Sequence, residues 1–502
     1  MRKRRTIYLD DARHYYLYVF EPPMTMEEAW LPVDQVSGTA VDTFVYGVAC
    51  GGLFYPTKVG GQFGQMKRPS SGPYAAAMWG RPFTGAATWR AWANMQGLMQ
   101  RGLDPLKVLV DRAHEKDMQF IASLRMGTLE PTDPAHMASE GGRMLAHAEV
   151  RELLFSITEE LVSEYDIEGV ELDFSAPPAS WDLFRPEEAR ENIPLLTELV
   201  SKIASMVRGR QDSPRTVGAK VFPTEQMNLE RGLDVRTWLS QGLLDFVVPA
   251  VFYYPGALDP DLPLDWIVEA AHPHDTAIYG LLSPYSSGSA SRDKQYATTN
   301  KIRAAAANYF DRGVDGLYTC FLPWPLGDEQ RALLTELGDP ESLRKGDKHY
   351  HLRRRDPEAA QIGCDYAALP LEVPFGHPGK LHEVPFYISD DIEAEARHIR
   401  RVVLRINISE LVTADRLTLL LNGVSLDGER CLRAPRAGLG PYGAQWLEFD
   451  LTEVRPRKGH NVLEISLDDR PPELESAVTV EDVEIIIEYG RYPSGLNPPP
   501  KN

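Results

Sequence analysis

The stretch 168-EGVELDF-174 gives the strongest indication of the fold. Its apolar and acidic residues alternate, and a strand turns successive side chains to opposite faces, so Glu171 and Asp173 share one face. A helix-like run, 151–165, precedes the stretch, and the proline-containing segment 175–178 follows it. A parallel strand that ends in acids and opens into a loop is typical of a (β/α)8 barrel, whose active sites lie at the carboxyl ends of the strands.

Short apolar runs alternate with helix-like segments from residue 1 to about residue 340, which predicts an α/β fold with a parallel sheet. The predicted strands are Tyr16–Phe20, Thr43–Ala49, Met118–Leu124, Gly169–Phe174, Val217–Phe222, Asp245–Val251, Ala277–Leu282 and Gly316–Phe321. Helix-like runs separate most of them. Residues 1–340 therefore predict a (β/α)8 TIM-type barrel with insertions.

The remainder of the chain changes character twice. Residues 341–368 are rich in charge, notably in the basic cluster 344–355, and we expect a charged linker there. From 369 to 492, strand-like runs alternate with turn signals, and Asn422-Gly423 predicts a type I′ hairpin turn between two of them. These residues predict an all-β accessory domain, a two-sheet sandwich, behind the barrel.

Composition bounds the possible partners. The net charge of the 502 residues is −19, which disfavours nucleic acid and an anionic membrane as main partners, because phosphate contacts need a basic face. No run approaches 18 apolar residues, so we expect no membrane span. The basic start, Met1 to Arg5, resembles that of a signal peptide, but charged residues up to His14 interrupt any apolar core. We expect a cytoplasmic protein, with an exported form left open and no indication of the oligomeric state.

Side chains just past the predicted barrel strands define the expected site. They include the acids Glu171, Asp173, Glu130 and Glu225, together with Arg125, Tyr253 and Trp324. Lys58 is added because it lies in the long insertion 51–88, which follows the second predicted strand and is expected to cover the same face. Acids, aromatic rings and an arginine suit a neutral polyhydroxylated substrate, and hydrolysis of a glycosidic bond needs two carboxylates with different roles.

The acids differ in their expected roles. Asp173, near the strand end, is expected to act as the acid or to stabilise an oxocarbenium-like state, with Glu225 as the second carboxylate. Glu171 lies one layer deeper, where it and Arg125 would set the charge state of Asp173. A purely structural role for Glu171, held by Arg125 or by Lys220, and a solvated position for Glu225 stay open.

The aromatic residues Tyr253 and Trp324 are expected to stack on sugar rings. Arg125, Glu130 and Lys58 complete the expected substrate-binding set. These residues imply no metal or organic cofactor.

Four segments carry a resemblance to a known family: 55-YPTKVG-60, 121-IASLRM-126, 169-GVELDF-174 and 232-GLDVRTW-238. In this order they resemble a family of glycosyl-hydrolase-like barrel proteins, near the family 10-like glycosylhydrolases, that carry a β-sandwich behind the barrel. The resemblance covers nearly the whole chain. It implies the fold and, more loosely, a glycosidase activity.

The fourth predicted strand is also similar to that of family 18 chitinases, whose pattern is Asp-Gly-x-Asp-x-Asp-x-Glu. Aligned on Gly169, the two inner acids of that pattern match Glu171 and Asp173, but the final glutamate, the proton donor of that family, falls on Ser175. A serine cannot act as this acid, so the chitinase mechanism does not transfer.

The sequence thus predicts a glycoside hydrolase acting on an oligo- or polysaccharide. One alternative is a non-catalytic carbohydrate-binding barrel protein, which the serine at position 175 favours. The other is a metal-dependent lyase or hydrolase that uses Glu171, Asp173 and Glu225 as hard carboxylate ligands.

Overall fold

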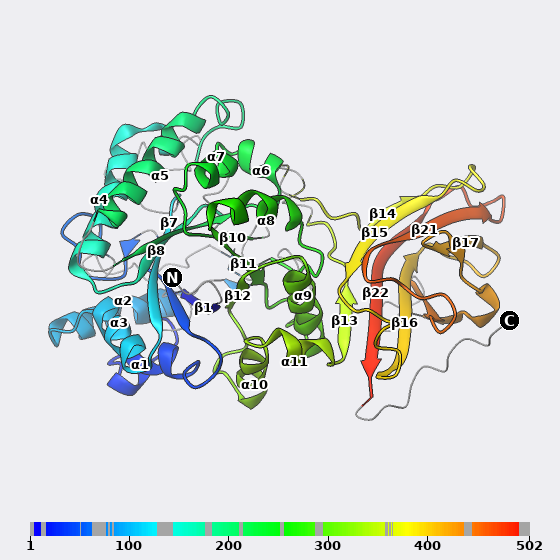
Figure 1. Cartoon of the computed structure of the whole chain (residues 1–502), viewed down its shortest axis with the longest axis horizontal. Helices are drawn as coiled ribbons and strands as arrows, with labels where there is room; N and C mark the ends of the chain where they lie inside the picture. The colour runs from blue at the N-terminus through cyan, green and yellow to red at the C-terminus, as the bar shows by residue number, and fades with distance from the viewer. Residues whose placement is uncertain are drawn as a thin grey trace.

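The computed structural model describes residues 5–11, 17–50, 52–62, 77–78, 81–82, 85–127, 144–175, 183–209, 214–250, 256–286, 295–356, 360, 363, 365–435 and 444–490. Two lobes lie side by side along the long axis of the molecule, a barrel wrapped in helices and a β-sandwich (Figure 1). Two residues of the predicted site, Glu130 and Tyr253, lie outside the described ranges.

Within the described residues, parallel strands close into a barrel in the order β1-β12-β11-β10-β9-β8-β7-β2. The strands are β1 (Thr6–Asp11), β2 (Thr43–Gly47), β7 (Gln119–Arg125), β8 (Gly169–Asp173), β9 (Thr216–Val221), β10 (Phe246–Pro249), β11 (Ala277–Leu282) and β12 (Gly316–Cys320). Ile7, Val45, Ile121 and Tyr318 belong to a buried cluster inside the barrel. The predicted fold class is confirmed.

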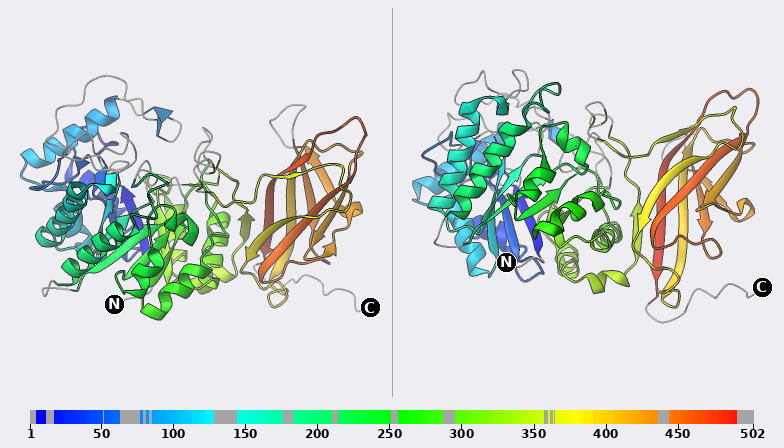
Figure 2. Two further views of the ribbon diagram at one scale, coloured as in Figure 1. Left: turned by 90° about the horizontal axis from the view of Figure 1, so that it is seen from above. Right: turned by 45° about the horizontal axis from the view of Figure 1, so that its top comes forward.

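Helices cover the outside of the barrel (Figure 2). They are α1 (Met26–Asp34), α2 (Gly85–Gln100), α3 (Pro105–Glu115), α4 (Ala148–Glu164), α5 (Ile193–Arg208), α6 (Glu225–Leu229), α7 (Val235–Ser240), α8 (Asp265–Ala271), α9 (Thr299–Asp311), α10 (Asp328–Glu336) and α11 (Pro340–Arg344). In α5 the buried residues Leu196, Leu199, Val200 and Ile203 recur at helical spacing, so one stripe of the helix faces the sheet. Two-residue strands form two small ladders beside the barrel: β3 (Ala49–Cys50) with β4 (Gly52–Leu53), and β5 (Ala77–Met78) with β6 (Arg81–Pro82).

The predicted first strand, Tyr16–Phe20, is wrong. Residues 17–20 form a turn and a bend, and the first barrel strand is β1, Thr6–Asp11. The sequence did not indicate β1 because its apolar run, Thr6–Leu9, is short and has charged residues on both sides. This pattern resembles an interrupted signal peptide. The other seven predicted strands are confirmed, with ends shifted by no more than two residues.

The second lobe consists of antiparallel sheets. One described sheet holds β13 (Lys348–His351), β22 (Val478–Tyr489), β16 (Ile399–Ser409), β20 (Gln445–Asp450), β19 (Leu432–Pro435) and β14 (Leu371–Val373). The other holds β15 (His382–Ile388), β21 (Gly459–Asp469), β17 (Arg416–Leu421) and β18 (Val424–Ser425). Between β17 and β18, Asn422 and Gly423 have φ values of 53° and 79°, the positive values that a type I′ turn requires.

The segment 341–368 differs from the expected charged linker. It contains part of α11 and the whole of β13, which pairs antiparallel with β22 of the sandwich. Tyr350 of β13 is fully buried, and the Lys348 ammonium lies 2.9 Å from the Asp390 carboxylate. The charged residues of this segment indicate solvent exposure when only the local sequence is considered. Asp390, the partner of Lys348, lies 42 residues further along the chain, so the local sequence does not reveal this buried ion pair.

Helix α9 joins the two lobes. Its Ala304 belongs to the apolar core of the sandwich, and its Asn308 side chain donates to the Tyr387 carbonyl at 2.8 Å and accepts from the Ser389 amide at 2.8 Å. The sandwich is therefore docked on the barrel by both apolar and polar contacts. Among the described residues, no helix combines the length and apolar character needed to cross a bilayer.

Candidate active site

Five charged side chains converge inside the barrel near the carboxyl ends of four strands. They are Asp11 of β1, Arg125 of β7, Glu171 and Asp173 of β8, and Lys220 of β9. None is more than 7% exposed. Three acids thus face two bases in a low-dielectric interior, where each charge needs a partner. We call these five residues the rim cluster.

Glu171 occupies the deeper layer. Its Oε1 accepts from Ser123 Oγ at 2.7 Å and from the Tyr318 hydroxyl at 3.1 Å, and it lies 3.3 Å from Lys220 Nζ. Burial raises the pKa of Glu171, Lys220 opposes that shift, and the neighbouring Asp173 adds to it. Its Oε2 has no hydrogen-bond partner among the described residues.

Asp173 lies at the end of β8 and accepts from three donors. The Ser175 amide and hydroxyl each donate to Oδ1 at 3.0 Å, and Lys220 Nζ donates to Oδ2 at 3.3 Å. Burial lowers the pKa of Lys220, but the charges of Asp173 and Glu171 outweigh it, so the pKa is raised overall and the ammonium form persists. Three donors therefore hold this carboxylate in a fixed orientation.

Asp11 and Arg125 form the other half of the rim cluster. Arg125 Nη2 donates to Asp11 Oδ2 within a buried ion pair, and Arg125 is the register partner of Asp173 on the neighbouring strand. Gly47 is the register partner of Asp11 and belongs to β2, the strand between β1 and β7, and a Cβ added there would stand 3.2 Å from Asp11 Oδ1. The missing side chain at position 47 therefore leaves room for the pair.

Sequence reasoning missed Asp11 because it missed β1. The signal was present, since TIYLDD ends in acids after an apolar run just as GVELD does. The adjacent Asp10 is also fully buried, and neither of its carboxylate oxygens has a hydrogen-bond partner among the described residues. Burial, reinforced by Asp11, raises the pKa of Asp10.

Two predicted site residues have other surroundings. Glu225 begins α6, and both of its oxygens pair with Arg236 of α7 at 2.7 and 2.9 Å, which lowers the pKa of Glu225. Lys58 forms an exposed ion pair with Glu164 of α4 at 3.1 Å. The structure brings Glu171, Asp173 and Arg125 together but connects neither Glu225 nor Lys58 to them.

Trp324 follows β12 and packs against the inner cluster of the barrel, with its ring edge-on to Phe20 at 5.6 Å. Phe321, at the end of β12, has φ of 48°, a conformation that costs a bulky residue about 1–3 kcal/mol. This turn takes the chain from the strand toward Trp324. Stacking of Trp324 on a sugar ring stays a prediction.

No group of three or more histidine, cysteine, aspartate or glutamate side chains within the described residues could hold a metal ion. In the rim cluster the Lys220 ammonium lies 3.3 Å from both Glu171 and Asp173, where a bridging cation would have to sit. The described residues therefore do not assemble the three-carboxylate ligand set that the metal-dependent alternative requires.

No family model matches the chain, and no curated protein matches it. Among solved structures, it is similar to α-L-fucosidase isoenzyme 2 from Paenibacillus thiaminolyticus, with 12% identity, a TM-score of 0.41, and coverage of 72% of this chain and 50% of that one. It is similar to an α-L-fucosidase GH29 from Bacteroides thetaiotaomicron, with 11% identity, a TM-score of 0.36, and coverage of 91% and 84%. It is also similar to an α-L-fucosidase from Vibrio sp. strain EJY3, with 11% identity, a TM-score of 0.36, and coverage of 92% and 87%. Structural similarity at these identities and TM-scores does not indicate the activity of the chain. The resemblance to family 10-like glycosylhydrolases stays an expectation.

Proposed function

We propose that the chain is a glycoside hydrolase that acts on an oligo- or polysaccharide at the carboxyl end of the barrel, with Asp173 as its central carboxylate. The observation that carries the proposal is the buried pair Glu171 and Asp173 bridged by Lys220. Such groups are expensive to bury, and clusters of this kind at the carboxyl ends of barrel strands are characteristic of active sites.

The charge balance of the rim cluster suits the reaction. Three acids and two bases leave one excess negative charge when all are ionised, and the transition state of glycoside hydrolysis carries positive charge on the sugar ring. A fixed carboxylate in a dry interior stabilises such charge more than water does. The donors around Asp173 hold its carboxylate in a fixed orientation, which suits a nucleophile or an electrostatic stabiliser.

The proton donor is then a second carboxyl group. Glu225 suits this role poorly because Arg236 favours its ionised form. Glu130 remains the sequence-based candidate. Glu171, whose pKa is raised by burial, lies one layer below and is bridged to Asp173 by Lys220.

The test uses a panel of chromogenic aryl glycosides covering both anomers of common hexoses and deoxyhexoses. Asp173→Asn should lower kcat on any accepted substrate by about 10²–10⁴-fold or more, because the swap keeps the shape and removes the charge. Asp245→Asn is the matched control, since Asp245 accepts from the Val217 amide at 2.8 Å at the opposite end of the sheet. Wild-type turnover by Asp173→Asn would exclude this assignment.

A non-catalytic carbohydrate-binding barrel is the second candidate, and one observation favours it. Both oxygens of Asp173 already have partners, and the residue is 2% exposed. For this candidate we expect oligosaccharide binding by calorimetry without turnover, and retention of that binding in Asp173→Asn.

A further inference from the structure

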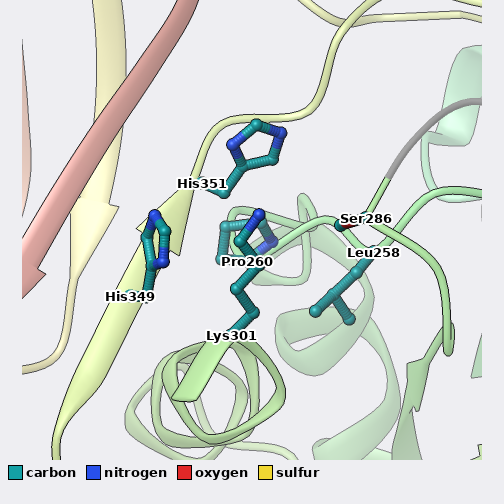
Figure 3. Close-up of a pocket in the computed structure, with 6 residues that line it drawn as sticks. All are labelled: Leu258, Pro260, Ser286, Lys301, His349 and His351. Atoms are coloured by element: carbon teal, nitrogen blue, oxygen red, sulfur yellow. The ribbon is translucent and has the colours of Figure 1, made fainter. Parts of the chain in front are cut away.

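The segments that follow β10 and β11 meet the residues that connect the two lobes. We call β13 and the described residues that follow it, as far as Tyr366, the connector. Leu258, Pro260 and Ser286 of the barrel lie against Lys301 of α9 and face His349 and His351 of β13, lining one small pocket (Figure 3). The carboxyl-end rim of the barrel is thus in direct contact with the start of the sandwich lobe.

Backbone hydrogen bonds join three rim segments into a small ladder. Ala257 pairs with Tyr285, and the Leu258 amide donates to the Tyr285 carbonyl at 2.6 Å. Tyr285 pairs in turn with Tyr296, and the Ser286 amide donates to the Gln295 carbonyl at 2.9 Å. We call this set of contacts the rim ladder. It begins two residues after Ser283, which continues the inward-facing series of β11.

Asp259 follows the rim ladder directly and is 5% exposed. Its Oδ1 accepts from the Asp261 amide at 2.9 Å, and its Oδ2 accepts from the Tyr366 hydroxyl and lies 3.5 Å from Arg353 Nε. Its backbone carbonyl accepts from the Tyr309 hydroxyl of α9 at 2.6 Å. The position of the ladder's end is therefore set largely by residues of the connector and of α9.

Arg353 is the centre of this arrangement. Its guanidinium lies 2.7 and 3.1 Å from the two oxygens of Asp365, and it stacks 4.7 Å above the Tyr366 ring. The side chains of Arg353 and Asp365 are 4% and 0% exposed. A buried guanidinium held between two carboxylates has fixed geometry, because any displacement leaves a charge unpaired in a low-dielectric interior.

We infer that Arg353 is a positioning residue of the active site, which it serves by holding Asp259 and, through Asp259, the rim ladder and Ser283. The inference rests on the proposed function, since it concerns the same carboxyl-end site. It makes the connector part of the catalytic rim: the barrel needs Arg353, Asp365 and Tyr366 for full turnover even though the rim cluster lies wholly within residues 11–220.

Asp259→Asn in the full chain is the decisive variant, because it removes the attraction to Arg353 while leaving Arg353 paired with Asp365. Amide exchange at Leu258 and Ser286, which donate the ladder hydrogen bonds, should accelerate, while exchange in β7 and β8 stays unchanged. On an accepted glycoside, kcat/KM should fall by about 10–100-fold, the cost of displacing a substrate-positioning segment by about an ångström.

The matched control is Arg354→Gln. Arg354 is adjacent in sequence but pairs with Glu481 and Asp482 of the sandwich, so its loss should change neither exchange at the rim ladder nor kcat/KM. Arg353→Lys should give intermediate values, because one ammonium keeps the charge but cannot reach both carboxylates with a planar fork.

Unchanged exchange at Leu258 and Ser286 in Asp259→Asn would overturn the inference, and so would faster exchange with wild-type kcat/KM. If the wild-type chain hydrolyses no glycoside, the proposed function fails, and the hold of Arg353 on the ladder is then decided by the exchange measurement alone.

Discussion

Lys220 is the residue on which the charges inside the barrel depend. It is fully buried, its ammonium lies 3.3 Å from each carboxylate of β8, and it lies 5.0 Å from the centre of the Tyr318 ring. Without it, Glu171 and Asp173 would be two like charges in a space that excludes water. Lys220 therefore compensates both carboxylates, while burial keeps the pKa of Glu171 raised.

Lys220→Met should therefore lower the free energy of unfolding by about 3–5 kcal/mol at neutral pH, because it leaves a buried carboxylate pair uncompensated. The double variant Lys220→Met/Glu171→Gln should recover part of this loss, since one of the two acids is then neutral. Urea unfolding of the single and double variants measures the difference. An equal loss in both would show that the coupling between Lys220 and Glu171 is negligible.

Asp10 offers a contrasting case, a buried acid without a charged partner among the described residues. Its folded pKa is raised by burial and by Asp11, so the native chain holds the proton more tightly than the unfolded chain does. The protonated form is favourable at low pH, and stability is lost as pH rises above the unfolded value near 4.

Asp10→Asn should remove this loss, because the amide stays neutral. Relative to the wild type, the variant should gain stability between pH 4 and pH 8, by at most about 1.4 kcal/mol per pH unit. Thermal unfolding of both proteins across this range gives the comparison. Parallel curves would mean that Asp10 is ionised in the native state.

At the scale of elements, the sequence predicts those strands, and those residues at strand ends, that a clear local pattern marks. β8 was found because apolar and acidic residues alternate between a helix-like run and a loop, and Glu171, Asp173 and Arg125 followed from their places at strand ends. β1 was missed because its apolar run is short and flanked by charge, and Asp11 was lost with it. Glu225 was expected in a loop near the site, but Thr224 caps α6 and Arg236 holds the carboxylate, contacts that strand order alone does not reveal.

The described part of the insertion after β2 also depends on a contact that sequence could not show. Glu160 of α4 accepts from the Tyr55 hydroxyl at 3.1 Å, from Thr57 Oγ1 at 2.6 Å and from the Lys58 amide at 2.6 Å. One carboxylate thus fixes residues 55–58 on α4 and directs the Lys58 side chain to the helix surface.

Glu160→Gln should lower the free energy of unfolding by about 1.5–3 kcal/mol. The charge-assisted hydrogen bonds are lost, and the new side-chain NH2 group faces hydroxyl and amide groups that act as donors in the wild type. Faster amide exchange at Lys58 should accompany the loss. Glu159→Gln, one residue earlier on the exposed face of the helix, is the control and should change neither quantity. Normal protection of Lys58 in Glu160→Gln would show that the apolar contacts of Tyr55 suffice to hold the segment.

At the scale of the whole molecule, the two lobes share a charged junction. Arg312 at the end of α9 lies 2.9 Å from Asp261 of the barrel and stacks 4.5 Å above Tyr387 of the sandwich. Lys458 of the sandwich pairs with Asp311 at 2.7 Å, and Tyr387 donates to the same carboxylate at 2.6 Å. These contacts join segments far apart in sequence, so the charge run at 341–368 could suggest a linker but not the docking that the structure shows.

We expect Asp261 to make this junction sensitive to pH. Burial raises the pKa of Asp261 to about 7; Arg312 opposes the shift, while Asp259 and Asp265 add to it. The native chain therefore binds this proton more tightly than the unfolded chain, and the resulting stability is complete below about pH 4 and is lost as pH rises to about 7. The difference between the native pKa of about 7 and the unfolded value near 4 corresponds to roughly 4 kcal/mol of stability, an upper limit because solvent and relaxation reduce it.

Asp261→Asn should flatten this part of the pH profile of stability. The stability of the variant relative to wild type should therefore increase from pH 4.5 to pH 7.5, as measured by thermal unfolding. Because Arg312 also contacts the sandwich, amide exchange near Tyr387 in the wild type should quicken over the same range and stay level in the variant. Equal pH profiles for the two proteins would mean that Arg312 keeps Asp261 ionised throughout, and that the junction does not titrate near neutral pH.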